Sequence, residues 1–222
     1  MKFSQGVAAR IALAAAGGLV LVGTAGAAVA AEVGDQDVDV NVDITAIEEP
    51  GSLSLTVAGT STDLTEGDSG DPTVRQFDGE LPTVTVTDTR DPASIAPNLY
   101  WYVVGQASAF EGPNGATIGA DKLGWTPRLV DGSDTGLVAE GEPVLTTEDE
   151  TTPETEGDNV GLVDQELLYI TLDSAAVRET GETSWTADAL LTLKTGVDVT
   201  PGSYSSTLTL SLFEDSSAPA QP

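Results

Sequence analysis

The sequence predicts an all-β protein, namely a single immunoglobulin-like or Greek-key β-sandwich that follows a cleaved signal peptide. Three observations support this fold class. Apolar and polar residues alternate with a period of two in short segments such as 53–57, 83–87 and 206–212, as they do in strands with one buried face. Turn-forming residues separate these segments. A helical period is indicated only weakly, at 173–179, and is not sustained in any other segment.

Residues 1–30 have the features of a signal peptide. Lys2 and Arg10 precede an uncharged run, and the region ends in small residues, so we expect cleavage after Ala30. The alternative is an uncleaved membrane anchor at 11–30, because that stretch has no charge and nearly reaches spanning length. Its high content of glycine and alanine favours cleavage. We therefore expect a secreted, extracellular protein without a membrane span in the mature chain.

The composition limits the partners of the protein. The 222 residues include 36 Asp and Glu against 8 Lys and Arg, which gives a formal net charge of −28. Such a charge repels the phosphates of nucleic acids, and we expect no nucleic-acid partner. The chain has no cysteine, so an exported domain must be held by its hydrophobic core without disulfides. We expect one domain at 31–215 and a disordered tail at 216–222.

The first half of the mature chain contains three predicted strands. Valine and isoleucine alternate with acidic residues at 38–44, and leucine and valine alternate with serine and threonine at 53–57. A polar loop is predicted at 59–72. A third strand follows at 83–87, where Val84 and Val86 should face the core.

The rest of the chain adds four predicted strands. They lie at 100–104, 167–172, 187–193 and 206–212, and the dense apolar run at 167–172 suggests a central strand. Only short strands are expected at 129–144, and an acidic loop is predicted at about 139–160. Thr200-Pro201-Gly202 is a strong turn signal before the last strand.

Candidate catalytic residues are few. The GDSGDP segment at 67–72 resembles the nucleophile loop of trypsin-like serine proteases, but the chain has no histidine and cannot form a Ser-His-Asp relay. It has neither a cysteine nucleophile nor an HExxH zinc motif. A carboxylate pair that hydrolyses glycans is the remaining enzymatic hypothesis, and the sequence singles out no such pair. We therefore expect a non-enzymatic protein with no cofactor except possible calcium.

Calcium is the metal that the sequence supports. Asp35, Asp37, Asp39 and Asp43 place carboxylates at alternate positions of the first predicted strand. The intervening valines mark a strand, and the glycine that an EF-hand loop requires is missing. One interpretation is a solvated acidic face. The other is a calcium site where these carboxylates meet acidic residues of the 59–72 loop.

Four aromatic residues are the candidate ligand-binding residues. Tyr100, Trp101 and Tyr102 are consecutive on a predicted strand, so Trp101 points opposite to both tyrosines. Either Trp101 lies in the core with the tyrosines half-exposed, or these rings form a stacking platform for a sugar. Trp125 lies between glycine and proline, which suggests a loop tryptophan that caps the sandwich or contacts a ligand.

The order of four segments resembles the WxL-domain surface proteins of Gram-positive bacteria, in the form found in exported actinobacterial proteins. The segments are VTVTDTR ending at Arg90, WYVVGQASAF at 101–110, IGADKLGWTP at 118–127 and ALLTLKTGVDVTPGSYSSTLTLSLF at 189–213. The two Trp-x-Leu motifs of the family are not intact here, and Trp101 and Trp125 are the positions that correspond best. The resemblance implies a β-sandwich that associates non-covalently with the cell wall and has peptidoglycan as ligand.

The expected function combines these observations. The leading hypothesis is a secreted, non-enzymatic protein of the cell surface whose partner is a cell-wall glycan. The alternative is a structural or adhesin subunit of a multi-protein surface assembly, with other surface proteins as partners, joined through exposed strand edges. Glycan hydrolysis by two carboxylates is the third hypothesis.

Overall fold

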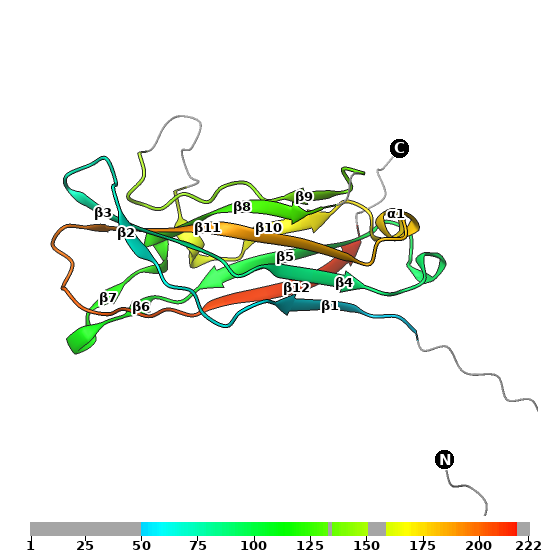
Figure 1. Cartoon of the computed structure of the whole chain (residues 1–222), viewed down its shortest axis with the longest axis horizontal. Coiled ribbons are helices and arrows are strands. Elements are labelled where there is room, and N and C mark those ends of the chain that lie inside the picture. The colour runs from blue at the N-terminus through cyan, green and yellow to red at the C-terminus, as the bar shows by residue number, and fades with distance from the viewer. Residues whose placement is uncertain (1–49, 133–134, 151–158, 217–222) are drawn as a thin grey trace, which may run out of the picture. The chain divides into compact units, whose positions relative to one another are not determined.

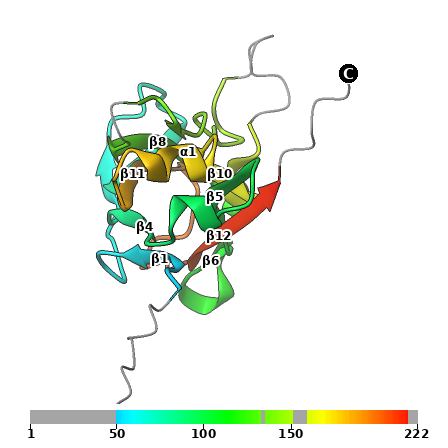
Figure 2. The ribbon, with the colours of Figure 1, turned by 90° about the vertical axis from the view of Figure 1, so that its right-hand side faces the viewer.

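Two antiparallel sheets form the body of the protein. The computed structural model describes residues 50–132, 135–150 and 159–216 (Figure 1). Sheet A has the strand order β1-β4-β11-β3-β2, and β8 also pairs with β11. Sheet B has the order β12-β5-β10-β9. Figure 2 looks along the strands and shows β4, β8 and β11 on one side, facing β5, β10 and β12. The predicted all-β sandwich is confirmed.

The strand bounds are as follows. Sheet A contains β1 (Leu53–Val57), β2 (Thr65–Gly67), β3 (Val74–Glu80), β4 (Val84–Asp88), β8 (Leu123–Asp131) and β11 (Ser184–Gly196). Sheet B contains β5 (Leu99–Ala107), β9 (Val138–Glu140), β10 (Glu166–Thr171) and β12 (Leu208–Ser216). A small hairpin is formed by β6 (Phe110–Glu111) and β7 (Thr117–Ile118). Short 3-10 turns lie at Pro92–Ser94, Pro113–Gly115, Ala120–Lys122 and Gly161–Val163.

The central strand of sheet A is β11. Its 13 residues alternate between buried and less buried positions, as the leucine-threonine pattern predicts. On one side it pairs first with β4 and then with β3, and on the other side it pairs with β8. The break between β3 and β4 falls at Pro82, which has no N–H to donate to the ladder. The chain therefore stops pairing with β11 at the end of β3 and pairs with the same side of β11 again at the start of β4.

An aromatic cluster joins the two sheets in the core. Trp101 of β5, Tyr169 of β10 and Trp185 of β11 are all fully buried. The ring centroids of Trp101 and Tyr169 are 5.4 Å apart at an interplanar angle of 79°, and those of Trp101 and Trp185 are 5.6 Å apart. The Tyr169 hydroxyl donates to the carbonyl oxygens of Val84 and Trp185, both at 3.3 Å. Burial raises the pKa of Tyr169, so the hydroxyl remains a donor.

An arginine clamp ties sheet A to sheet B. Arg90 follows β4 and donates from Nε and Nη2 to the two carboxylate oxygens of Asp88, at 2.9 and 2.7 Å. Its Nη1 and Nη2 also donate to Glu214 of β12, at 3.0 and 2.7 Å. The hydrogen bonds to Asp88 raise the pKa of Arg90 most, and those to Glu214 add to this effect. The Asp-Thr-Arg turn therefore holds the end of β4 against β12.

The helix α1 (Ser174–Glu179) confirms the weak helical prediction at 173–179. Asp173 is its N-cap, and its carboxylate accepts a hydrogen bond from the Ala176 N–H at 2.9 Å. Val177 is fully buried and fixes one side of the short helix to the core. Within the residues that the structure describes, no helix is long and apolar enough to span a membrane.

Some sequence predictions need correction. The predicted set lacks β3, and β2 lies inside the predicted polar loop at 59–72. β8 extends to Asp131, into the region 129–144 where only short strands are expected. The start of the predicted acidic loop at about 139–160 belongs to β9, and residues 151–158 of that loop lie outside the described residues. The signal peptide at 1–30, the strand at 38–44 and all of the tail beyond 216 also lie outside them.

Candidate functional site

The outer face of sheet B carries aromatic side chains that are partly buried or exposed. Along β5 the burial alternates, so that Trp101 and Val103 are fully buried while Tyr100 and Tyr102 are only partly buried. This is the result of the period-two geometry of a strand, which turns neighbouring side chains to opposite faces. The structure thus agrees with the interpretation in which Trp101 lies in the core and both tyrosines lie on the outer face.

The three outer rings form an aromatic ladder, which consists of Tyr100, Tyr102 and Phe213. Phe213 lies on β12 directly opposite Tyr102. The Tyr102 and Phe213 ring centroids are 5.4 Å apart at 24°, and those of Tyr100 and Tyr102 are 5.9 Å apart at 27°. Phe213 is 39% exposed. A run of stacked rings with an exposed end offers apolar surface together with two phenol hydroxyls.

An apolar stripe extends the aromatic ladder across the whole of sheet B. Ile170 of β10 lies opposite Tyr102 on the side away from Phe213, and Ala139 of β9 lies opposite Ile170. These side chains share a face because residues directly opposite each other in antiparallel strands point the same way. Asp215 lies opposite Tyr100 and gives the stripe an acidic border. The outer face of sheet B therefore presents apolar or aromatic side chains on all four of its strands, with an acidic residue at their border.

The two tryptophans have a different position from the tyrosines. Trp101 is 0% exposed and Trp125 is 2% exposed, so a ligand cannot reach either ring in this structure. Trp125 lies in β8 and not in a loop, which corrects the sequence prediction. Its ring packs across the sandwich on Gly105 of β5, where an added Cβ would lie 2.6 Å from the ring. Both tryptophans are core residues.

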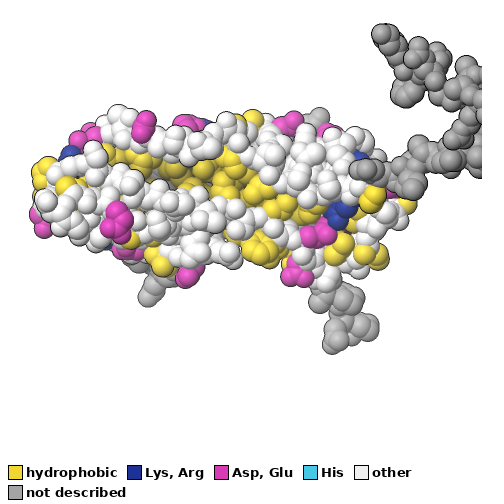
Figure 3. All heavy atoms as spheres, turned by 90° about the horizontal axis from the view of Figure 1, so that it is seen from below, with side chains coloured by type: hydrophobic (Ala, Val, Ile, Leu, Met, Phe, Trp, Pro, Cys, Tyr) yellow, Lys and Arg dark blue, Asp and Glu magenta, His cyan; other side chains and the backbone are white. Residues whose placement is uncertain are grey.

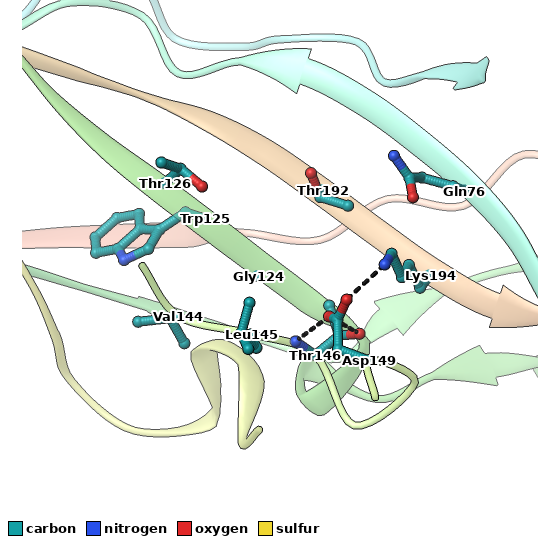
Figure 4. Close-up of a pocket in the computed structure, with 10 residues that line it drawn as sticks. All are labelled: Gln76, Gly124, Trp125, Thr126, Val144, Leu145, Thr146, Asp149, Thr192 and Lys194. Atoms are coloured by element: carbon teal, nitrogen blue, oxygen red, sulfur yellow. Dashed lines mark hydrogen bonds and ion pairs between the residues drawn. The ribbon is translucent and has the colours of Figure 1, made fainter. Parts of the chain in front are cut away.

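A small hollow lies beside β8 and β11 (Figure 4). Its volume is about 170 Å³, which is below the range of roughly 300 to 1,000 Å³ typical of small-molecule sites. An ion pair between Lys194 Nζ and Asp149 Oδ1 at 2.5 Å crosses it. The lining residues are Gln76, Gly124, Trp125, Thr126, Val144, Leu145, Thr146, Asp149, Thr192 and Lys194. The hollow is therefore smaller than a typical small-molecule site, and a structural ion pair lies in it.

The environment of Asp149 stabilises its charged form. Burial alone would raise the pKa of Asp149. Hydrogen bonds from Lys194 and from the Thr146 hydroxyl and N–H outweigh that effect and hold the pKa below its ordinary value of 3.8. Thr146 is almost fully buried, so these contacts fix the 144–149 segment against β11.

Replacing Asp149 with asparagine should remove a pH-dependent part of the stability. Because the folded pKa is lowered, the contribution is fully present above the ordinary value of 3.8 and is lost as the pH falls through the folded pKa. At neutral pH we expect Asp149→Asn to lower the free energy of unfolding by about 1 to 2 kcal/mol. Urea titrations at pH 7 and pH 3 measure this; an equal deficit at both pH values would contradict it.

The calcium prediction lies mostly outside the described residues. Asp35, Asp37, Asp39 and Asp43 all precede residue 50. Within the described part of the chain, no group of three or more acidic residues is placed to hold a metal ion. Glu66, in the 59–72 loop, accepts two hydrogen bonds from Arg75, at 2.8 and 3.0 Å.

One residue of the aromatic ladder was not found from the sequence. Phe213 ends a leucine-threonine segment, and its position after Leu212 suggests only that it faces away from the leucines. Its contact with Tyr102 depends on the register between β12 and β5, which are distant in sequence. The alternation could have indicated an exposed phenylalanine, but not its neighbour.

The comparisons with known proteins do not assign a family. No protein-family model and no curated protein matches the chain. Among solved structures, a match is a family 123 glycoside hydrolase from Clostridium perfringens, with 14% sequence identity and a TM-score of 0.29. The match covers 63% of this chain and 18% of that chain. At this TM-score it carries no argument about function, and the resemblance to WxL-domain proteins stays a prediction.

Proposed function

We propose that this protein is a secreted, non-enzymatic protein of the cell surface that associates non-covalently with cell-wall glycan. The aromatic ladder on the outer face of sheet B carries the proposal, because Tyr100, Tyr102 and the exposed Phe213 lie side by side there. The WxL-like order of segments and the signal-peptide features at 1–30 support the location.

The chemistry of the aromatic ladder suits a polysaccharide. Sugar rings present apolar C–H faces and polar hydroxyls, and tyrosine offers a matching apolar ring and hydroxyl. The apolar and aromatic side chains run across all four strands of sheet B, which offers an extended polymer several contacts in a row. The formal net charge of −28 disfavours polyanions such as nucleic acid, and it also disfavours binding to anionic wall polymers. Peptidoglycan is therefore the proposed ligand.

Catalysis is not part of the proposal. The chain has no histidine and no cysteine, which removes the usual nucleophile and base pairs. Incubation with labelled cell wall should release no soluble fragments. Release that is abolished by a single Asp or Glu substitution would instead support the hydrolase hypothesis.

Cell-wall binding should depend on the aromatic ladder. Each stacked ring is expected to contribute about 1 kcal/mol to binding, so the combined substitution Tyr100→Ala, Tyr102→Ala and Phe213→Ala should lower the affinity on the order of 100-fold. Co-sedimentation of residues 31–222 with purified walls measures this. Circular dichroism would check that the variant is folded.

The matched control changes apolar side chains of sheet A. Val130→Ala together with Leu190→Ala removes exposed hydrophobic surface from β8 and β11 and should leave sedimentation unchanged. Equal sedimentation of the ladder variant and the unchanged protein would contradict the proposal. Samples with and without calcium, and with walls stripped of teichoic polymers, test the calcium hypothesis and the role of anionic polymers in the same assay.

A second candidate function is that of a subunit in a multi-protein surface assembly. The same ladder favours it, because exposed phenylalanine and tyrosine are enriched at protein interfaces. Capture of a defined surface protein from culture medium, lost in the ladder variant, would support this function if the walls themselves do not bind. A monomer that captures nothing would count against it.

A further inference from the structure

One side of the sandwich is open between its two edge strands. β1 ends sheet A and β12 ends sheet B, and Figures 1 and 2 show both strands along the same lower side. Figure 3 views this side and shows a continuous stripe of hydrophobic side chains between polar borders. We call this stripe the edge groove. Its residues are Leu53, Leu55 and Val57 of β1 and Leu208, Leu210 and Leu212 of β12.

The side chains of the edge groove point inward but are not covered. Leu55 and Val57 lie opposite Val86 and Val84, which are both fully buried. Residues opposite each other share a face, so β1 presents these side chains to the core. Val57 is nevertheless 40% exposed, and the leucines of β12 are also only partly buried. A further strand beside β1 would remove this apolar surface from water.

The backbone of β1 also has unused hydrogen-bonding groups at this edge. The Thr89 N–H donates to the Ser52 oxygen and the Ala58 N–H donates to the Thr83 oxygen, both at 2.9 Å. Antiparallel ladders alternate, so the even-numbered residues of β1 bond to β4 and the odd-numbered ones point away from it. Within the described residues, the N–H and C=O groups of Leu53, Leu55 and Val57 therefore face the open edge.

We propose that residues 37–45 of the same chain occupy the edge groove as an additional antiparallel strand on β1. The structure does not describe this segment, whose sequence DVDVNVDIT has an apolar β-branched residue at every second position. Placing Ile44 opposite Leu53 also places Val42 opposite Leu55 and Val40 opposite Val57. The acidic residues between them would then point to solvent.

The connection between the segment and β1 has the right length for a hairpin. Residues 46–52 would form the loop, and Glu49-Pro50-Gly51 within it is a turn signal. The short link gives the segment a high effective concentration at its own groove, which favours it over the same segment of a second copy. The loop also lets the strand run back along the full length of β1.

Engineered disulfides test the proposed register in a chain that has no native cysteine. In this register Asp43 and Ser54 are opposite each other at a position without backbone hydrogen bonds, where Cα atoms approach most closely. The double variant Asp43→Cys with Ser54→Cys should therefore form an intramolecular disulfide in most molecules on mild oxidation. The matched control, Asp39→Cys with Ser54→Cys, offsets one cysteine by about 13 Å and should not.

The outcomes of this experiment are distinguishable. A monomeric, crosslinked product in the Asp43 variant alone, identified by intact mass, supports the proposal. Crosslinked dimers in place of monomers would show that the segment binds another copy and would overturn it. Equal crosslinking in both variants, or none in either, would overturn it as well.

A second pair of variants tests the docking without a crosslink. Val40→Asp with Val42→Asp places charges where the groove is apolar and should lower the melting temperature of the 31–222 chain by about 5 °C or more. Asn41→Ser with Asp43→Ser changes solvent-facing positions and should shift it by less than about 2 °C. The same melting temperature in both variants would contradict the docked strand.

Discussion

Replacing Trp101 with alanine is expected to lower the free energy of unfolding by about 3 to 5 kcal/mol. Trp101 is fully buried between the sheets and contacts both Tyr169 and Trp185 through its ring. Its removal would leave a cavity that neither sheet can fill without moving. The loss would be a large part of the stability of a domain of this size, which is typically about 5 to 15 kcal/mol.

The matched control is the neighbouring residue on the opposite face. Tyr102→Ala removes a similar ring from the same strand, but from the partly exposed outer surface, and should cost less than about 1.5 kcal/mol. Urea unfolding followed by far-ultraviolet circular dichroism measures both variants. Equal losses in the two variants would show that the alternation of β5 has been assigned to the wrong faces.

Arg90→Met should have a comparably large effect, on the order of 3 to 5 kcal/mol. The Asp88 carboxylate is 0% exposed and the Arg90 side chain is only 18% exposed. Without the guanidinium, a buried carboxylate would lose its charged partner, and the end of β4 would lose its link to Glu214 on β12. Removing one partner of a buried pair costs more than the pair contributes, because the remaining charge is not compensated.

The chain offers a control for the arginine clamp. Arg75 makes a similar bidentate ion pair with Glu66, but the Arg75 side chain is 33% exposed and the Glu66 side chain is 50% exposed. Arg75→Met should therefore lower the free energy of unfolding much less than Arg90→Met does, because solvent screens the exposed pair. If Arg90→Met were as mild as Arg75→Met in chemical denaturation, the clamp would not hold the sheets together.

The strands could be predicted where one face of the strand is buried and the other is exposed to solvent. β1, β4 and β12 follow the alternation of apolar and polar residues directly. The sequence does not predict β3, because Arg75, Gln76 and Asp78 interrupt its apolar pattern, and its pairing with β11 comes from tertiary contacts. Gly124 and Pro127 beside Trp125 predict a loop, although both are accommodated within β8.

The candidate site was only partly predictable. The opposite orientation of Trp101 and Tyr102 follows from adjacency on a strand, and the structure shows which face is the core. The contact between Tyr102 and Phe213 needs the pairing of β5 with β12, which no local pattern specifies. The arginine clamp likewise joins residues 90 and 214, so the sequence could suggest the turn but not its partner.

Glycan binding by the outer face of sheet B is tested most directly by nuclear magnetic resonance spectra of the tyrosine rings in the presence of ligand. The chain has four tyrosines. Tyr100 and Tyr102 belong to the aromatic ladder, and Tyr169 lies in the core. Tyr204 lies between β11 and β12, where its hydroxyl donates to the Thr200 carbonyl oxygen. Carbon-13 labelling of the rings gives one set of signals for each, and soluble peptidoglycan fragments serve as ligand. We predict shifts at Tyr100 and Tyr102 and none at Tyr169 or Tyr204. Unchanged spectra at saturating fragment concentrations, or shifts confined to Tyr204, would contradict glycan binding by the outer face of sheet B.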